Sequence, residues 1–355
     1  MRPARHEREH GSAHGASSQP VRQDGVAGQR QPSVLFVSYD LHANTRGAPG
    51  RDAVRRLLAR WSELIAGRGR ATTVTVGIGP TLPPRLGVGA PDALRELPAF
   101  AGERPEPGAG GGEIGVQICG PGPRACEALA GVLAGAGAGV LRPRWRQAGF
   151  LASGRPGAGA GAVFLAPPES GGTPRDLFGF KNGTANPGPQ ECERWVWLPG
   201  PGPYADGTFL VVRRIRLRVE EFGRLPVARQ EQIIGRRKQG GEPLGGGFEH
   251  DAGDLDARAP DGSYLLPADA HMRLADPGLD GGARMLRRGY SYENDVADRG
   301  TLFLAYMRDP LLFVRARERM ASGDALNAFT QPYGSALFYV LPGARPGRPL
   351  GSTVL

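Results

Sequence analysis

Apolar positions in the first half of the chain follow two periods, one typical of strands and one typical of helices. Three short segments are β-rich or alternate strictly, as expected for strands with a buried face. Between them, apolar residues recur on one helical face after Asp52, the predicted N-cap. The predicted elements lie, in order, at 34–39, 52–66, 73–78, 114–119, 126–133 and 140–145. Their order of strand, helix, strand, strand, helix, strand is that of a ferredoxin-like domain.

The second half repeats this order less regularly. A long strand is predicted at 209–219, in which Arg214, Arg216 and Arg218 alternate with apolar residues and predict a solvated face. The remaining predicted elements are a helix at 227–234, a strand at 301–307, a helix within 311–329 and a strand at 335–341. We therefore predict an α+β protein of two ferredoxin-like domains, each a four-stranded antiparallel sheet with helices packed on it.

Composition sets the boundaries of these domains. Residues 1–33 are polar and lack an apolar core, which predicts a disordered tail whose His6, His10 and His14 are solvated. The N-terminal domain is expected at 34–170 and the C-terminal domain at 171–355, joined by a Gly/Pro-rich stretch from 152 to 172.

Charge and cysteine content narrow the class of protein. The net charge is +9, but the arginines are spread along the chain without interleaved aromatics, so we expect no nucleic-acid partner. No apolar stretch has the length needed to cross a membrane. The three cysteines show no metal-ligand spacing, which fits a reducing compartment. The sequence shows no export signal, and we expect a cytoplasmic protein.

Two features carry candidate chemistry. One is the loop Gly179-Phe180-Lys181-Asn182-Gly183-Thr184-Ala185-Asn186-Pro187, and the other is His271, followed by Met-Arg-Leu-Ala. Outside the tail, His42 and His250 are the other histidines, and their surroundings suggest no special role. Further segments at 233–244, 285–292 and 300–310 complete the pattern.

In this order, these segments resemble the dye-decolourising (DyP-type) haem peroxidases over nearly the whole chain after residue 33, in particular the branch that includes deferrochelatase-like proteins. The resemblance implies one haem b per chain, held mainly by the C-terminal domain, with His271 as its iron ligand. It places Arg287 as the distal arginine, with Arg288 as the alternative. Arg236 would contact a haem propionate, and Thr301 and Phe303 would line the distal pocket. Asp309 is a candidate partner for the proximal imidazole.

Asn182 departs from the family pattern, because it stands where the Gly-x-x-Asp-Gly motif has its distal aspartate. An amide cannot exchange a proton as a carboxylate does, although it can hold a water or orient peroxide. We expect reaction with peroxide to persist through Arg287 and ordered water, more slowly and without the pH dependence of a carboxyl group. The alternative is that Asn182 is a turn residue before Gly183 and that only haem binding remains.

The expected function is that of a peroxidase that reduces hydrogen peroxide while oxidising phenolic or dye-like donors. The alternatives are a weakly catalytic or non-catalytic haem-binding protein and a deferrochelatase-like activity. Oxidising equivalents could reach the surface through aromatic side chains, for which the candidates are Trp195, Trp197, Tyr204, Tyr290 and Tyr292. A homo-oligomer is expected, and the C-terminal segment 350–355 faintly resembles peptides that load such enzymes into protein nanocompartments.

Overall fold

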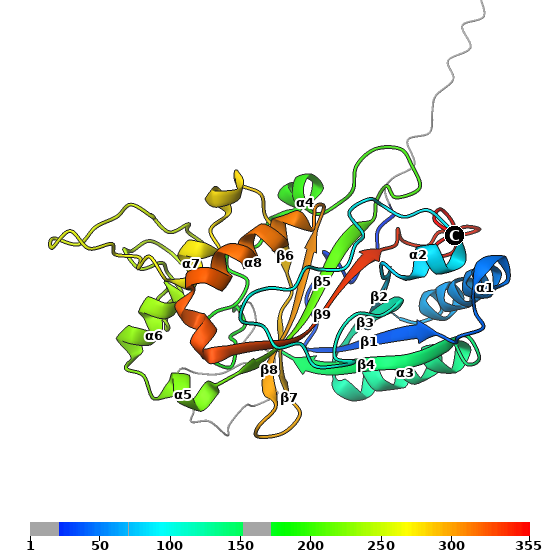
Figure 1. Ribbon diagram of the computed structural model, residues 1–355, viewed down its shortest axis with the longest axis horizontal. Helices are drawn as coiled ribbons and strands as arrows, with labels where there is room; N and C mark the ends of the chain where they lie inside the picture. The colour runs from blue at the N-terminus through cyan, green and yellow to red at the C-terminus, as the bar shows by residue number, and fades with distance from the viewer. Residues whose placement is uncertain (1–20, 70, 152–171) are drawn as a thin grey trace, which may run out of the picture.

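A computed structural model describes residues 21–69, 71–151 and 172–355. Within these residues, nine strands form one sheet in the order β5-β9-β2-β3-β1-β4-β7-β8-β6, and β5 also pairs with β8. The sheet therefore closes on itself as a barrel, with the short β6 attached at β8. Figure 1 shows α1, α2 and α3 at one end of the molecule and α5, α6, α7 and α8 at the other.

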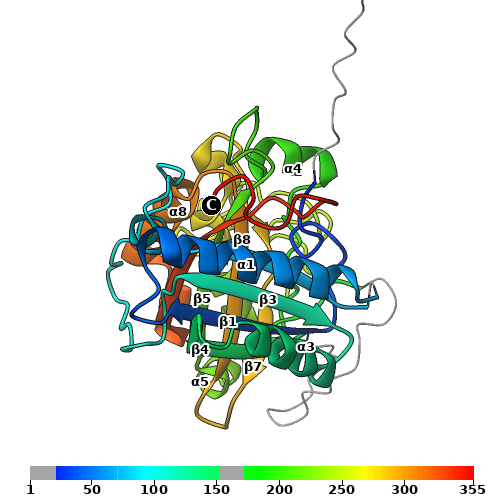
Figure 2. The same cartoon turned by 90° about the vertical axis from the view of Figure 1, so that its right-hand side faces the viewer.

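The N-terminal half has the predicted ferredoxin-like arrangement. Its strands lie in the order β4-β1-β3-β2, and all of these neighbours are antiparallel. Both long helices pack on the same side of these strands, as Figure 2 shows. The elements are β1 (Ser33–Leu41), α1 (Gly47–Ala66), β2 (Thr73–Ile78), α2 (Leu82–Leu86), β3 (Ile114–Gly120), α3 (Pro123–Ala136) and β4 (Leu141–Phe150).

The C-terminal half repeats the arrangement with the strand order β9-β5-β8-β7. The long helix α8 lies against its outer face through Phe313, which contacts Phe303 of β8. The elements are α4 (Pro189–Trp195), β5 (Thr208–Leu217), α5 (Val219–Gly223), α6 (Val227–Ile234), α7 (His271–Leu274), η1 (Pro277–Asp280), β6 (Leu286–Arg287), β7 (Tyr290–Glu293), β8 (Arg299–Met307), α8 (Leu311–Gly323), η2 (Ala325–Phe329) and β9 (Thr330–Val340).

The two halves join through their second and fourth strands. Strand β2 pairs with β9 at Gly77 and Ile78, and β4 pairs with β7 between Phe150 and Ser291. Apolar side chains from both halves, including Phe36 and Phe338, whose ring centroids lie 5.6 Å apart, form a shared core. The predicted domains are therefore halves of one barrel with a common interior.

Barrel closure explains why the predicted solvated arginine face is wrong. Arg214 lies over the rings of Tyr333 (4.6 Å) and Trp145 (5.6 Å) and donates hydrogen bonds to Gln147 of β4. Arg216 lies 4.0 Å from the Tyr333 ring and pairs with carboxylates. Both face across the barrel toward strands of the other half or its rim, and Arg218 alone is exposed.

Two boundaries also differ from prediction. Helix α1 begins at Gly47 after Arg46, so Asp52 lies inside the helix rather than at its N-cap. The chain is packed before residue 33, because Val26 is fully buried and Gln23 is 7% exposed. The predicted disordered tail is therefore too long at its C-terminal side. Residues 1–20, with the tail histidines, and the linker at 152–171 lie outside the described residues.

All three cysteines are buried and unpaired. No helix among the described residues is long and apolar enough to cross a membrane.

Gln23 is one of the side chains that hold the segment 21–32 to the barrel, and its contribution can be tested. Gln23 accepts a hydrogen bond from Val76 N (2.8 Å) and donates to the carbonyl oxygens of Val76 (2.8 Å) and Leu341 (2.7 Å). Gln23→Ala removes the partner shown for Val76 N and for Leu341 O, whereas Val76 O still accepts from Leu341 N, and should lower the free energy of unfolding by about 1–3 kcal/mol. Urea unfolding measures this, and the matched change at exposed Gln239 should have little effect; equal losses would contradict the assignment.

Candidate active site

His271 is the first residue of α7, and its ring is held by a buried carboxylate. Its Nδ1 lies 2.6 Å from Asp324 Oδ2, and the Asp324 side chain is only 3% exposed. The other oxygen of Asp324 accepts a hydrogen bond from Leu326 N at the start of η2. Burial alone would raise the pKa of Asp324, but its interaction with His271 brings that pKa below its usual range.

This carboxylate fixes the orientation of the imidazole. The His271 side chain is 37% exposed, and within the described chain no hydrogen bond engages its second ring nitrogen, Nε2. A histidine anchored at Nδ1 with Nε2 open is the arrangement usual for metal-ligating imidazoles. Asp309, the partner considered from the sequence, instead accepts a hydrogen bond from Leu311 N at the start of α8. Asp324 gave no sequence signal, because 53 residues separate it from His271.

Arg287 lies on the outer face of the barrel. It pairs with Ala305 in the β6–β8 register, so its side chain shares a face with Phe303 and Thr301 two and four residues earlier on β8. Within the described residues, no hydrogen bond or ion pair engages the Arg287 guanidinium. Burial, together with the charges of Arg236 and Arg284, lowers its pKa. The charges of Arg236 and Arg284 thus reach Arg287, and this positive potential favours an anionic ligand.

Asn186 positions Arg287, a role that the sequence did not indicate. Its Nδ2 donates to the Arg287 carbonyl oxygen at 2.7 Å, and its Oδ1 accepts from Arg287 N at 2.9 Å. This pair of hydrogen bonds ties the loop at 179–187 to β6. Asn186 was part of the motif identified in the sequence, but nothing in its spacing pointed to a partner 101 residues away.

Asn182 lies close to the segment that follows Arg287. A Cβ added to Gly289 would lie 3.2 Å from Asn182 Nδ2 and 3.7 Å from Thr301 Cγ2. Asn182 N donates to Pro174 O at 2.8 Å, and Gly183 adopts a φ of +96°, where a side chain is strained. The structure therefore brings Asn182, Thr301 and the Arg287 segment together, while Asn182 also precedes a tight turn.

Gly235 and Arg236 lie between two parts of the site. Gly235 packs next to His271, and the charge of Arg236 acts on Arg287. Gly235 has a φ of +90°, and a Cβ there would lie 2.8 Å from Met272 Cβ, next to His271. The Arg236 guanidinium donates to the carbonyl oxygens of Gly241, Glu249 and Asp251. It is thus a loop-organising residue whose charge still acts on Arg287.

The remaining candidates lie elsewhere. Arg288, the alternative distal arginine, is 3% exposed and donates to the carbonyl oxygens of Val26 and Gly28. His250 is exposed, and its Nδ1 lies 3.1 Å from Thr184 O. Among the aromatic candidates, Trp197, Tyr290 and Tyr292 are buried, whereas Trp195 and Tyr204 are partly exposed.

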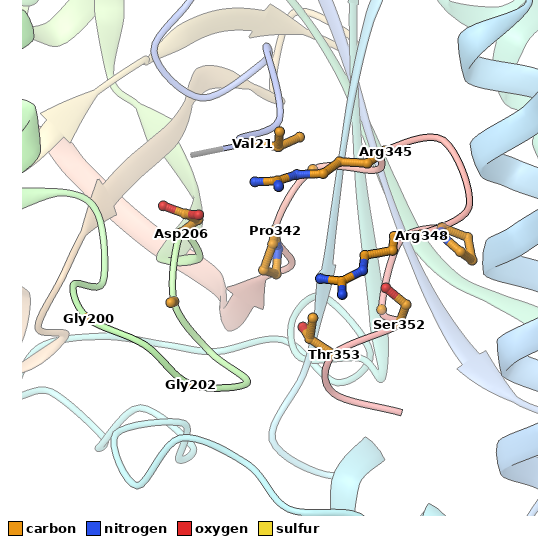
Figure 3. Close-up of a pocket in the computed structure, with 13 residues that line it drawn as sticks. Val21, Gly200, Gly202, Asp206, Pro342, Arg345, Arg348, Ser352 and Thr353 are labelled. Atoms are coloured by element: carbon orange, nitrogen blue, oxygen red, sulfur yellow. The ribbon is translucent and has the colours of Figure 1, made fainter. Parts of the chain in front are cut away.

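A cavity of about 440 Å³ lies beside the C-terminus. Arg345 and Arg348 point into it, across from Asp206 and the loop at 200–202 (Figure 3). Figure 1 shows the C-terminus at the opposite end of the molecule from α7. This cavity is therefore separate from His271, which begins α7.

Comparison with known proteins agrees with this geometry. Sequence models of the Dyp-type peroxidase N-terminal and C-terminal domains match residues 23–151 and 173–345. The chain belongs to the DyP-type peroxidase family. A dye-decolorizing peroxidase of Thermobifida fusca is 35% identical, over 97% of this chain and 86% of that protein. A deferrochelatase of Yersinia pestis is 34% identical over 76% of this chain, but only 64% of its own length is covered.

Solved structures support the same assignment. A DyP-type peroxidase from Streptomyces coelicolor superposes with a TM-score of 0.83 at 32% identity, covering 93% of this chain and 94% of the other. One from Cellulomonas bogoriensis gives a TM-score of 0.83 at 32% identity, with 94% and 95% covered. The expected fold, the peroxidase class and the haem cofactor are thereby confirmed.

Asp176, a partly buried acid just before the loop at 179–187, has a titration that can be measured. Asp176 Oδ1 accepts hydrogen bonds from Phe178 N (2.9 Å) and Phe180 N (3.1 Å), and burial raises its pKa to about 6 despite these bonds. The folded protein therefore binds this proton more tightly than the unfolded chain does. Stability should be lost as pH rises from the unfolded pKa through about 6.

Asp176→Asn keeps an acceptor oxygen and removes the titration. Its free energy of unfolding, relative to that of the unchanged protein, should increase by up to about 3 kcal/mol between about pH 4 and pH 7. Urea unfolding across this range measures the difference. A difference that stays constant with pH would contradict the raised pKa.

Proposed function

We propose that the chain binds haem b on the outer face of its C-terminal half, with His271 as the iron ligand. There it reduces hydrogen peroxide and oxidises phenolic or dye-like donors. The observation that carries this proposal is the His271–Asp324 pair, which leaves Nε2 open, in a fold where Arg287 has no counter-ion within the described residues. An anchored imidazole suits an iron that accepts a nitrogen donor. An unpaired cation suits a bound group that carries or develops negative charge.

When bound, haem supplies the iron at which peroxide is cleaved and from which donors are oxidised. Asp324 holds the proton on His271 Nδ1 and increases the donor strength of the ring. Arg287, held by Asn186, stabilises negative charge on the departing oxygen of peroxide. Arg236 adds positive potential that suits the haem propionates, although its hydrogen bonds go to backbone carbonyls.

Asn182 occupies the position of the distal carboxylate. Its amide orients water or peroxide beside Thr301 but cannot carry a proton between the two peroxide oxygens. The proposed enzyme is therefore a slow peroxidase that depends on Arg287 and ordered water. The same residue favours the second candidate, a haem-binding or haem-handling protein with little peroxide chemistry; a deferrochelatase-like activity belongs to this second group.

The finer expectations remain predictions. These are a cytoplasmic location, a homo-oligomer and loading into a nanocompartment. The C-terminal segment argues against the last of them, because Leu350 and Leu355 are buried and Leu350 N donates to Ser62 Oγ of α1. A segment packed in this way is not a free docking peptide.

Stopped-flow mixing of haem-loaded protein with hydrogen peroxide tests the proposal. We expect a peroxide-dependent change of the Soret band in the unchanged protein, and a rate higher by about 10²-fold or more in Asn182→Asp, which restores proton transfer. Only the variant should show a rate that depends on the titration of a carboxyl group. Asn44→Asp adds the same charge at an exposed site and should react like the unchanged protein.

The outcomes separate the two candidates. No Soret change in the unchanged protein, with a rapid change in Asn182→Asp, would select the haem-binding protein. Equal rates for the unchanged protein and Asn182→Asp would contradict the role assigned to Asn182.

A further inference from the structure

A loop of the N-terminal half reaches into the C-terminal half behind His271. This loop, residues 87–113, connects α2 to β3, and Glu103 lies within it. The Glu103 carboxylate accepts hydrogen bonds from Arg213 Nη2 of β5 (2.6 Å) and Arg317 Nε of α8 (2.7 Å). All three side chains are buried, with exposures of 10% for Glu103, 2% for Arg213 and 9% for Arg317.

Aromatic rings also lie against this triad. The Arg213 guanidinium lies beside the ring pair of Phe100 and Phe313, at 5.7 and 5.4 Å from their centroids. Its Nε is buried and has no hydrogen-bond partner among the residues that the structure describes. Two buried cations therefore share one carboxylate, which leaves an excess of positive charge in a region of low dielectric constant.

Arg317 connects the triad to Asp324, the carboxylate that holds His271. Its Nη1 donates to Asn327 Oδ1 at 3.3 Å, and Asn327 N donates to Asp324 O at 3.0 Å. The positive charge of Arg317 is also among the influences that lower the pKa of Asp324. A continuous path of contacts thus runs from Glu103 through Arg317 to Asp324 and His271.

We propose that Glu103 is a positioning residue that holds Arg317 behind the Asp324–His271 pair and thereby sets the electron affinity of the haem iron. The inference rests on the proposed role of His271 as iron ligand. Positive charge near the proximal ligand favours reduced iron, and negative charge favours oxidised iron. Glu103 offsets part of the charge of Arg213 and Arg317, so the N-terminal half contributes to the chemistry of a site it does not itself contain.

The test is the Fe(III)/Fe(II) midpoint potential of haem-loaded protein. Glu103→Gln removes the shared negative charge, so the potential should rise. Arg317→Gln removes a positive charge near Asp324, so the potential should fall. The double variant should return close to the unchanged protein. General damage to packing would instead move both single variants in the same direction.

Glu106→Gln is the matched control. Glu106 lies on the same loop and also pairs with an arginine of β5, Arg216, but its side chain is 46% exposed and screened by solvent. Its substitution should leave the potential unchanged. Equal shifts for Glu103→Gln and Glu106→Gln, or shifts of the same sign for Glu103→Gln and Arg317→Gln, would overturn the proposal.

Two further measurements keep the test decisive. If Glu103→Gln does not fold, Arg317→Lys and Arg317→Gln are compared instead. The midpoint potential should be retained in Arg317→Lys and should fall in Arg317→Gln. Equal potentials in these two variants would overturn the proposal. Resonance Raman of the ferrous protein reports the iron–imidazole stretch. Its absence from the unchanged protein would refute the ligand role of His271, whereas its presence with unaltered potentials in all variants would refute the role of Glu103 alone.

Discussion

Closure of the sheet is the constraint on which the rest of this structure depends. Each ferredoxin-like half has two free strand edges, and each pairs its second strand with the fourth strand of the other half. The ring that results gives each main strand a neighbour on both sides, although the two junctions pair only a few residues, and creates an interior filled from both halves. The helices are consequently confined to the outside, where α8 packs against the outer face of β8.

The candidate site is assembled on this outer face from segments far apart in the sequence. The loop at 179–187 is tied to β6 by Asn186, α6 ends against α7 at Gly235, and Asp324 reaches His271 from the end of α8. The Asn186 and Asp324 contacts each hold a candidate site residue without engaging the guanidinium of Arg287 or Nε2 of His271. A site built in this way is ready for its ligand before the ligand arrives, which reduces the cost of ordering it.

Sequence periodicity was sufficient for the regular elements and for the chemistry carried by contiguous motifs. The strand at 73–78 and the helix at 227–234 were predicted with their observed bounds, because alternation and helical periodicity are local signals. The partner of His271 was left open, with Asp309 as a candidate, and the exposure of the arginines on β5 was predicted wrongly. Both depend on which distant strand or helix lies opposite. Asp324 and Asp309 are equally plausible in the sequence, and only packing distinguishes them.

The central claim is that His271, anchored by Asp324, binds the iron of haem. Its most direct test is a titration of the protein with haem, followed by the absorption spectrum, for the unchanged protein, His271→Ala and His250→Ala. The account predicts the same stoichiometric complex and spectrum for the unchanged protein and His250→Ala, and loss of that spectrum and of tight binding in His271→Ala. An unaltered complex in His271→Ala would contradict it.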